Sequence, residues 1–269
     1  MKNIVSFASM LWVMGNLLIG FTLLLPIAII SWLVPIAAVS RGCTFLAEHI
    51  YRIAVWVDSF WMQRILGIHL VIKGKANSDS APVIICNHQS WFDIPLVQHV
   101  ITGNGPIIKF LIKREIVWVP IIGWICLALN FPRLSRGKRE SKGESDFSII
   151  QKASKNHGNN AGALLIFPEG TRFSEIKKAK QQQPYQHLLR PKTGGLKMIK
   201  QHSNADTSLV DITIDYHQKN VRIWNCLRAD PPKITITLEH FKFSEIENVE
   251  TWLEQRWLQK DKLLSGIET

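Results

Sequence analysis

Residues Val83 to Asp93 read Val-Ile-Ile-Cys-Asn-His-Gln-Ser-Trp-Phe-Asp, four apolar positions followed directly by mainly polar ones. A short apolar run of this kind is typical of a buried strand, here residues 83–86. Helical spacing follows near 92–100, so the intervening residues lie in a loop between a strand and a helix. Scaffolds commonly present reactive side chains in such strand-end loops.

Short apolar runs separated by turns continue on both sides of this stretch, from residue 67 onward. Besides residues 83–86, we expect strands at 68–73, 106–112, 163–167, 209–216 and 234–239. The last two also show the period-2 alternation of a strand. Further helices are expected at 144–157 and in the tail, after the capping-box pattern Ser244-Glu-Ile-Glu247. Residues 67–269 are therefore predicted to form an α/β domain with a mixed, largely buried sheet flanked by helices.

The N-terminal part of the chain is far more apolar than the rest. After Lys2 the next charged residue is Arg41, which leaves residues 3–40 without a charge. Because a bilayer core needs roughly 20 helical residues, we expect one span at about 8–30, followed by a shorter or interfacial piece. A hairpin that dips into one leaflet is the alternative. A cleaved signal peptide is a further alternative, although the apolar run is longer than such a peptide requires.

Residues 41–66 carry the chain out of this apolar segment. Their apolar side chains recur at roughly helical spacing, which predicts an amphipathic helix that lies on the bilayer or, equally, a helix that faces the core. Pro26 and Pro35 predict a bend in the second half of the preceding run. Residues 1–66 are thus predicted to be a hydrophobic, membrane-anchoring helical segment. The basic residues that follow it outnumber Lys2, so the positive-inside rule predicts an inner-membrane protein whose body faces the cytoplasm.

The charge balance indicates an anionic partner. The chain has 32 Lys and Arg against 21 Asp and Glu, a formal net charge of +11. This balance suits a phospholipid surface, a phosphorylated small molecule or nucleic acid. The basic stretch 133–144 is predicted to be a surface loop. It lacks interleaved aromatic residues for stacking on bases, so no nucleic-acid partner is predicted.

Cysteine usage narrows the chemistry further. Four cysteines are scattered through the chain without a CxxC pair. This pattern argues against a disulfide framework and against a cysteine-rich zinc site, and it suits a reducing compartment. No metal site is predicted.

His88 and Asp93 are the first candidates for chemistry. The two side chains can meet across a strand–loop–helix junction. A carboxylate on one ring nitrogen fixes the tautomer of a histidine and makes the other nitrogen a better base. The chain has no G-x-S-x-G nucleophile motif, so such a base would activate a hydroxyl on a substrate. A structural histidine with satisfied hydrogen bonds is the alternative.

A second set of candidates, Phe167-Pro-Glu-Gly-Thr-Arg172, also follows a predicted strand. Gly170 allows the backbone to approach a ligand closely, and Arg172 offers a planar fork for phosphate or carboxylate. Glu169 can hold that arginine or a substrate hydroxyl. A surface turn with an incidental ion pair is the alternative.

A third stretch, Lys113-Arg-Glu-Ile-Val-Trp-Val-Pro-Ile-Ile-Gly123, combines two cations with an apolar run. The uncharged run covers residues 116–131 and is short for a membrane span. We expect it to be buried core or a wall that contacts an acyl chain. A patch that dips into the membrane is the third possibility.

In order and spacing, these three stretches resemble the first three sequence blocks of the glycerolipid acyltransferases, the PlsC-like 1-acylglycerol-3-phosphate acyltransferases. The resemblance covers roughly residues 67–215. Arg190-Pro-Lys-Thr-Gly-Gly195 also resembles the basic glycine segment of the subgroup that contains the bacterial YihG-type proteins and eukaryotic lysophospholipid acyltransferases. Two positions depart from the family pattern. Phe173 replaces the serine that usually follows the third block, and residues 210–215 lack the proline common in the fourth.

The resemblance implies an enzyme that moves a fatty acyl group from acyl-CoA or acyl carrier protein to the free hydroxyl of a lysophospholipid. The most direct acceptor is 1-acyl-sn-glycerol 3-phosphate, which would give phosphatidic acid in phospholipid biosynthesis. His88 would be the general base and Asp93 would orient it. Lys113 and the Gly170 backbone N–H would stabilise the oxyanion.

The resemblance also implies how the acceptor is held. Arg172, with Lys113 or Arg114, would bind its phosphate, while Glu169 and Thr171 would position it. Because a thioester is already activated, no cofactor is expected. The expected partners are the two substrates and membrane lipids, with acyl carrier protein as a possible protein partner.

Other functions remain compatible with the sequence. One is acyl transfer to a different lysophospholipid head group in acyl-chain remodelling, or to a lipid A precursor. A second is a hydrolase in which His88 activates water. A third, of another class, is a membrane-tethered, non-enzymatic binder of anionic ligands.

Overall fold

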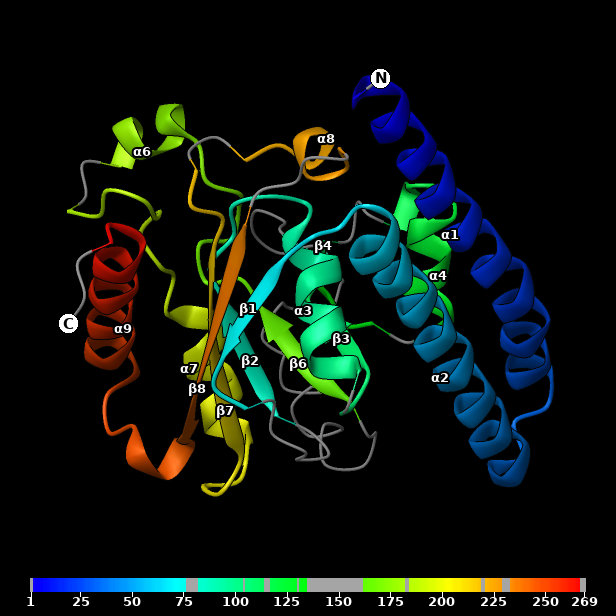
Figure 1. The fold of residues 1–269 in the computed structure, drawn as a ribbon. Helices are drawn as coiled ribbons and strands as arrows, with labels where there is room; N and C mark the ends of the chain where they lie inside the picture. Colours follow the sequence, from blue (N-terminus) through cyan, green and yellow to red (C-terminus); the bar gives the residue numbers. More distant parts are fainter. Residues whose placement is uncertain are drawn as a thin grey trace.

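A computed structural model describes residues 2–75, 82–103, 105–113, 117–129, 131–134, 162–181, 184–218, 221–228 and 233–266. At its centre is a six-stranded sheet in the order β1-β8-β7-β2-β6-β3 (Figure 1). Its strands are β1 Leu70–Lys73, β2 Val83–Cys86, β3 Ile108–Phe110, β6 Ala163–Ile166, β7 Ser208–Asp215 and β8 Ile234–Lys242. All six lie within or overlap the predicted stretches. A separate parallel pair joins β4 Ile112–Lys113 to β5 Arg133–Leu134.

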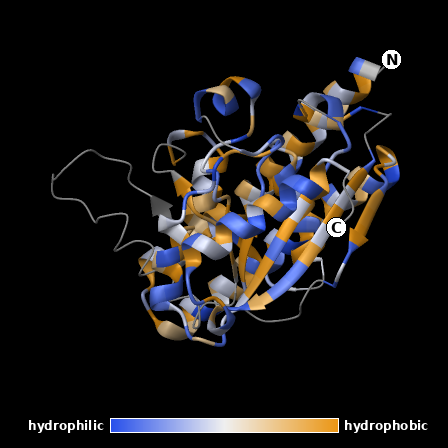
Figure 2. Ribbon diagram, turned by 90° about the vertical axis from the view of Figure 1, so that its left-hand side faces the viewer, coloured by the Kyte–Doolittle hydropathy of each residue, from blue (hydrophilic) through white to orange (hydrophobic). Residues whose placement is uncertain are grey.

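The sheet is mixed, as predicted. β7 and β8 pair antiparallel, whereas β1 with β8, β2 with β7 and β6, and β3 with β6 pair parallel. In β2, Val83, Ile84 and Ile85 have no exposed surface. A strand covered on both faces reads as a continuous apolar run, which explains why this one was predictable from sequence alone. Hydrophobic residues run through the central strands in Figure 2.

Helices cover both faces of the sheet. On one face, α3 (Asp93–Thr102) packs with α2 (Ala37–Phe60) behind it; on the other lie α7 (Gly194–His202) and α9 (Val249–Leu264) (Figure 1). The tail helix is confirmed, but its predicted capping box is wrong. Ser244 lies in the 3-10 turn Phe243–Glu245, and Asn248 caps α9 by accepting from the N–H groups of Glu250 and Thr251. A cap one residue before the first helical residue satisfies these otherwise unpaired donors.

The N-terminal segment forms a helical hairpin. α1 (Lys2–Leu33) continues through Pro26, and the bend falls at Pro35, before α2 returns beside it (Figure 1). Asn16 donates to the Ala54 carbonyl at 2.9 Å, and the rings of Trp12 and Trp61 stack at 4.4 Å. By length and composition, α1 is long and apolar enough to cross a membrane. Only 6% of its most apolar 18-residue stretch is buried inside the protein.

The hairpin is bonded to the α/β domain. Tyr51 donates to the Ile108 carbonyl at 3.2 Å, and Arg52 donates to the carbonyls of Thr102 and Gly105. The predicted amphipathic helix is therefore present, and its buried stripe faces the core, while Trp56 is 66% exposed on its other side. The core-facing alternative for residues 41–66 is thus confirmed, and contact of the exposed face with a bilayer stays a prediction.

The apolar run after β4 is only partly core. α4 (Ile122–Ala128) packs on α1, and Cys126 lies with Leu24 in a cluster that also includes Phe131. Trp118, by contrast, is 84% exposed. The short helices α6 (Glu175–Gln181) and α8 (Ile223–Cys226) complete the described elements. The predicted helix at 144–157 lies outside the described residues, as does most of the basic stretch 133–144.

Candidate active site

The site begins where β2 ends. Asn87 is fully buried, and its side chain donates to the Ile214 carbonyl at 3.0 Å and accepts from the Ile214 N–H at 2.8 Å. These two bonds continue the pairing of β2 with β7 by one step after the backbone has left the strand. The next residue, His88, is thereby held at the carboxyl edge of the sheet.

The structure brings the predicted pair together. His88 Nδ1 lies 2.8 Å from Asp93 Oδ2, and the side chain of Asp93 is fully buried. The same carboxylate oxygen accepts from the backbone N–H groups of Gln89 and Ser90. Since a carboxylate only accepts, a neutral His88 carries its proton on Nδ1, which leaves Nε2 unprotonated and able to accept a proton. The ring also stacks on Phe167, with centroids 4.0 Å apart.

Tyr216 completes the surroundings of Asp93. Tyr216 is the residue that follows β7, and its hydroxyl donates to Asp93 Oδ1 at 2.5 Å. Burial raises the pKa of Tyr216 well above its ordinary value, and the charge of Asp93 raises it further. The hydroxyl therefore stays protonated and stays a donor. The sequence predicted Tyr216 only as an apolar strand position, because its partner lies 123 residues earlier.

Glu169 connects the two motif loops, and it does so without contacting Arg172. Its Oε1 accepts from the His88 N–H at 2.9 Å and its Oε2 from the Leu189 N–H at 3.0 Å, with 1% of the residue exposed. Burial raises the pKa of this carboxyl to about 8, although the two backbone bonds pull it down. Both oxygens of Glu169 thus have protein partners. The predicted contact of Glu169 with an acceptor hydroxyl stays a prediction.

The rest of the second motif forms a turn beside His88. The Phe173 N–H donates to the His88 carbonyl at 2.7 Å, which fixes the turn against the loop that carries His88. Gly170 has φ +68°, a conformation that favours glycine. Its N–H donates to the Phe167 carbonyl at 2.9 Å. To stabilise an oxyanion, the Gly170 N–H would have to leave its bond to the Phe167 carbonyl. The predicted oxyanion role of Gly170 stays a prediction.

One cation lies on this turn, and a second lies beside it on α6. The Arg172 guanidinium is 4.7 Å from the centre of the exposed Trp91 ring, a cation–π contact that leaves its N–H groups open to a ligand. Lys177 Nζ donates to Thr171 Oγ1 and to the Arg172 carbonyl, each at 2.8 Å. The predictions did not include Lys177. Its basic neighbours on α6 gave no reason to single it out.

The third stretch is placed only in part. Lys113 is the last residue of β4, which begins two residues after β3 ends. Its backbone therefore lies near the end of β3 in the chain. Its side chain and all of Arg114 lie outside the described residues. Their predicted roles in binding phosphate and oxyanion therefore stay predictions.

The arrangement defines a class of protein. The pattern that describes the acyltransferase family matches residues 68–215, more than half of the chain, and the chain belongs to that family. The fold agrees: the crystal structure of the 1-acyl-sn-glycerophosphate acyltransferase PlsC from Thermotoga maritima matches all of this chain with a TM-score of 0.64 at 17% identity.

Similar proteins carry more specific names. An uncharacterized acyltransferase of Schizosaccharomyces pombe is 27% identical over 69% of this chain and 59% of its own length. The 1-acyl-sn-glycerol-3-phosphate acyltransferase of Cocos nucifera is 33% identical over 40% of this chain and 33% of its own. That of Pseudomonas aeruginosa is 26% identical over 57% and 58%. The chain thus spans about a third to three fifths of the length of these relatives. None of them distinguishes the predicted subgroup.

Proposed function

We propose that the protein transfers a fatty acyl group from a thioester to the free hydroxyl of a lysophospholipid. The carrying observation is the buried Asp93 with His88 on one oxygen and Tyr216 on the other. Family membership supports acyl transfer, and relatives named 1-acyl-sn-glycerol-3-phosphate acyltransferases favour 1-acyl-sn-glycerol 3-phosphate as the acceptor. Acyl-CoA and acyl carrier protein are the candidate donors.

The geometry supports a direct transfer. His88 Nε2 takes the proton of the acceptor hydroxyl while the hydroxyl oxygen attacks the thioester carbonyl. The tetrahedral intermediate then collapses, the carbon–sulfur bond breaks, and the imidazolium returns the proton to the departing thiolate. Asp93 stays ionised throughout and stabilises the imidazolium. The products are an ester and a free thiol, and the chemistry consumes neither ATP nor a cofactor.

The acceptor phosphate is assigned to the turn after β6. Arg172 presents its fork over Trp91, and Lys177 adds a second positive charge next to Thr171. Two cations beside a general base suit a substrate whose hydroxyl and phosphate are a few bonds apart. Lys113 and Arg114 are proposed to contribute from the third stretch.

We also infer that the hairpin holds the domain on the membrane by entering one leaflet. α1 contacts the domain at more than one point: Ser6 donates to the Trp224 carbonyl, and the ring centroids of Phe21 and Trp124 lie 5.3 Å apart. A helix held along one side in this way fits a hairpin better than a free span. The positive-inside rule favours the cytoplasmic face of the inner membrane.

The decisive experiment identifies products. Purified protein is incubated with a panel of lysophospholipids and acyl thioesters, and the lipids are analysed by mass spectrometry. We expect phosphatidic acid from 1-acyl-sn-glycerol 3-phosphate, and no product with the His88→Ala variant. Free fatty acid released without an acceptor would indicate a hydrolase. Acylation of a lysophospholipid with another head group would indicate acyl-chain remodelling. If no thioester is turned over, the protein is instead a non-enzymatic binder of anionic ligands.

A further inference from the structure

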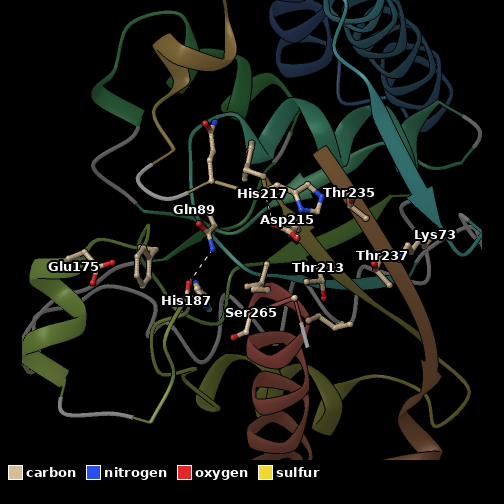
Figure 3. A pocket seen from close by; sticks show the side chains of 16 residues that line it. Lys73, Gln89, Glu175, His187, Thr213, Asp215, His217, Thr235, Thr237 and Ser265 are labelled. Atoms are coloured by element: carbon tan, nitrogen blue, oxygen red, sulfur yellow. Dashed lines mark hydrogen bonds and ion pairs between the residues drawn. The ribbon is translucent and has the colours of Figure 1, made fainter. Parts of the chain in front are cut away.

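A cavity of about 490 Å³, lined by both polar and apolar groups, lies beside the candidate active site on the α9 side of the sheet (Figure 3). Its floor is the sheet itself. Because side chains alternate along a strand, Thr213 of β7 and Thr235 and Thr237 of β8 point away from the core side chains of those strands. The register sets Thr213 opposite Thr237, and Lys73 of β1 opposite Thr237 on its other side. α9 ends before it covers this patch, so Ser265 and its neighbours form one wall.

The cavity abuts the catalytic pair through three of its lining residues. The Gln89 N–H and the Tyr216 hydroxyl both donate to Asp93, and the Phe173 N–H donates to the His88 carbonyl. Gln89 also donates through its side chain to the His187 carbonyl at 3.1 Å. One end of the cavity therefore borders the loop that carries His88 and Asp93, although neither of these residues lines it.

The opposite wall of the cavity is held in an unusual conformation. His217 has φ +51°, which is rare for a residue with a side chain. Its Nδ1 lies 3.1 Å from Asp215 Oδ2 and its Nε2 2.8 Å from Thr235 Oγ1. Residues held in sparsely populated backbone conformations cluster at functional sites, where surrounding contacts keep them in place.

The lining combines apolar side chains with several hydroxyl and amide groups, which can bond to a chain of amides and hydroxyls. Thr213 is 3% exposed, and its hydroxyl oxygen has no hydrogen-bond partner among the described residues. A buried polar group without a partner is costly, so a ligand that bonds to it would be stabilised. In Figure 3, Gln89 and His187 lie towards one end of the cavity and Lys73 lies at the other. Lys73 supplies a positive charge where a ligand would leave the site.

We propose that this cavity binds the phosphopantetheine arm of the thioester donor, with the thioester at Gln89 and the phosphate at Lys73. This inference rests on the proposed function. Acyl-CoA and acyl carrier protein carry the thioester on the same arm, which contains two amides, a hydroxyl and a phosphate. The volume lies within the range of about 300–1,000 Å³ typical of ligand pockets. The cavity borders the end of α9, and α9 and the α1–α2 hairpin lie on opposite faces of the sheet (Figure 1).

The test separates the arm from the rest of the donor. Two variants remove its contacts: Lys73→Met removes the charge, and Thr237→Val removes a hydroxyl at nearly constant volume. Lys75→Met is the matched control, because Lys75 is exposed, carries the same charge two residues away and does not line the cavity. Transfer rates are measured with three donors: palmitoyl-CoA, palmitoyl-loaded acyl carrier protein, and the palmitoyl thioester of N-acetylcysteamine. The last of these lacks the phosphate and most of the arm.

We expect Lys73→Met to lower kcat/KM about tenfold for both full donors relative to the truncated thioester, the order of one charge-assisted hydrogen bond. Lys75→Met should leave that ratio unchanged, and the KM for the lysophospholipid should not move in any variant. An effect confined to palmitoyl-CoA would assign the site to the nucleotide, and one confined to palmitoyl carrier protein would assign it to a protein contact. Either result, or a change only in the lysophospholipid KM, would overturn the proposal.

A binding measurement keeps the proposal independent of turnover. Calorimetry with free 4′-phosphopantetheine should show binding to the wild-type protein and to Lys75→Met, with about tenfold weaker binding to Lys73→Met. Equal binding to all three would refute the site even if the enzyme transfers acyl groups. Conversely, selective binding without any acyl transfer would retain the site and contradict the proposed function instead.

Discussion

The hydroxyl of Tyr216 and the carboxylate of Asp93 are joined by a 2.5 Å hydrogen bond between the end of β7 and the start of α3. This contact places a neutral donor on the oxygen of Asp93 that faces away from His88. The carboxylate thus has donors on both oxygens, which fixes its plane and, through it, the plane of the imidazole. We therefore predict that Tyr216 is a positioning residue, which would act on His88 only through Asp93.

Tyr216→Phe tests this role. Hydrogen bonds to charged groups are worth about 1.5–3 kcal/mol, so we expect kcat to fall about tenfold or more while both KM values stay near those of the wild type. Tyr185→Phe is the control, because it removes a hydroxyl from another buried tyrosine in the core beneath α7 and α9. Equal losses in the two variants, or a loss confined to the thermal midpoint, would show that Tyr216 is merely structural.

His88→Ala is expected to abolish transfer without loss of the fold, because the side chain stands at a strand end and fills little of the core. Asp93→Asn should also be severe, since the amide can stabilise the wrong histidine tautomer. Both rates are measured with lysophosphatidic acid and a thioester, alongside circular dichroism. His240→Ala is the control, because its exposed ring bonds to the Lys75 carbonyl and His240 lies far along the chain from the His88 loop. Near-normal turnover in His88→Ala would rule out this mechanism.

The parts that could be predicted from sequence are those with local causes. The strand at 83–86 and the helix after Asp93 follow from runs of apolar residues, and the motif loops follow from the strand ends. The alternation in β7 was a weaker guide, because it suggests a solvent-exposed polar face. Asp211 is instead 1% exposed and lies 2.5 Å from Lys260 Nζ and 2.7 Å from Arg256 Nε. Arg256 and Lys260 lie on α9, and no local sequence pattern around Asp211 predicts that they are its partners.

The same reasoning explains what was missed. α7 begins at Gly194, and two successive glycines disfavour a helix. The helix forms because Leu196 and Ile199 are buried between the sheet and α9, a tertiary effect. Glu169 was predicted to face a ligand or Arg172, yet it bridges two backbone segments. Its second donor, Leu189, lies 20 residues later, in a loop whose path the sequence does not specify.

Arg172→Ala should weaken use of the acceptor more than use of the thioester. The guanidinium lies over Trp91 and is exposed, so its loss removes a phosphate ligand and no core contact. We expect the KM for lysophosphatidic acid to rise about tenfold or more, with little recovery in Arg172→Lys, because an ammonium cannot form two parallel bonds. Arg222→Ala, which removes another exposed arginine, serves as the control. A change in the thioester KM alone would place Arg172 in the donor site.

Glu169 predicts a pH dependence of stability. Its pKa is raised by burial to about 8, above the ordinary value of 4.5. Between these values the unfolded chain has released the proton and the folded chain still holds it. Its contribution to the free energy of unfolding is therefore fully present below about pH 4.5, falls as the pH rises, and is lost above about pH 8. Glu169→Gln should flatten this decline in denaturant unfolding, whereas Glu247→Gln, at an exposed position, should retain it. An unchanged slope in Glu169→Gln would contradict the assignment.

The exposed apolar side chains near the hairpin predict where the membrane is. Trp32 on α1 is 80% exposed and Trp118 before α4 is 84% exposed. Moving a large apolar side chain out of water is worth about 1.5–3 kcal/mol, so Trp32→Glu combined with Trp118→Glu should weaken binding to anionic vesicles by more than tenfold. Ile176→Glu is the matched control, since Ile176 is 72% exposed on α6, away from the hairpin (Figure 1).

Activity in two acceptor formats then separates membrane binding from chemistry. The double tryptophan variant should be slow on lysophosphatidic acid embedded in vesicles and close to wild type on acceptor dispersed in detergent, because none of the changed residues contacts His88 or Asp93. The remaining vesicle binding should fall as salt is raised, since the net charge of +11 is then screened from anionic lipid. Vesicle sedimentation at low and high salt measures this. If the double variant sediments like the wild type while Ile176→Glu does not, the membrane-binding surface lies at α6 and the hairpin has another role.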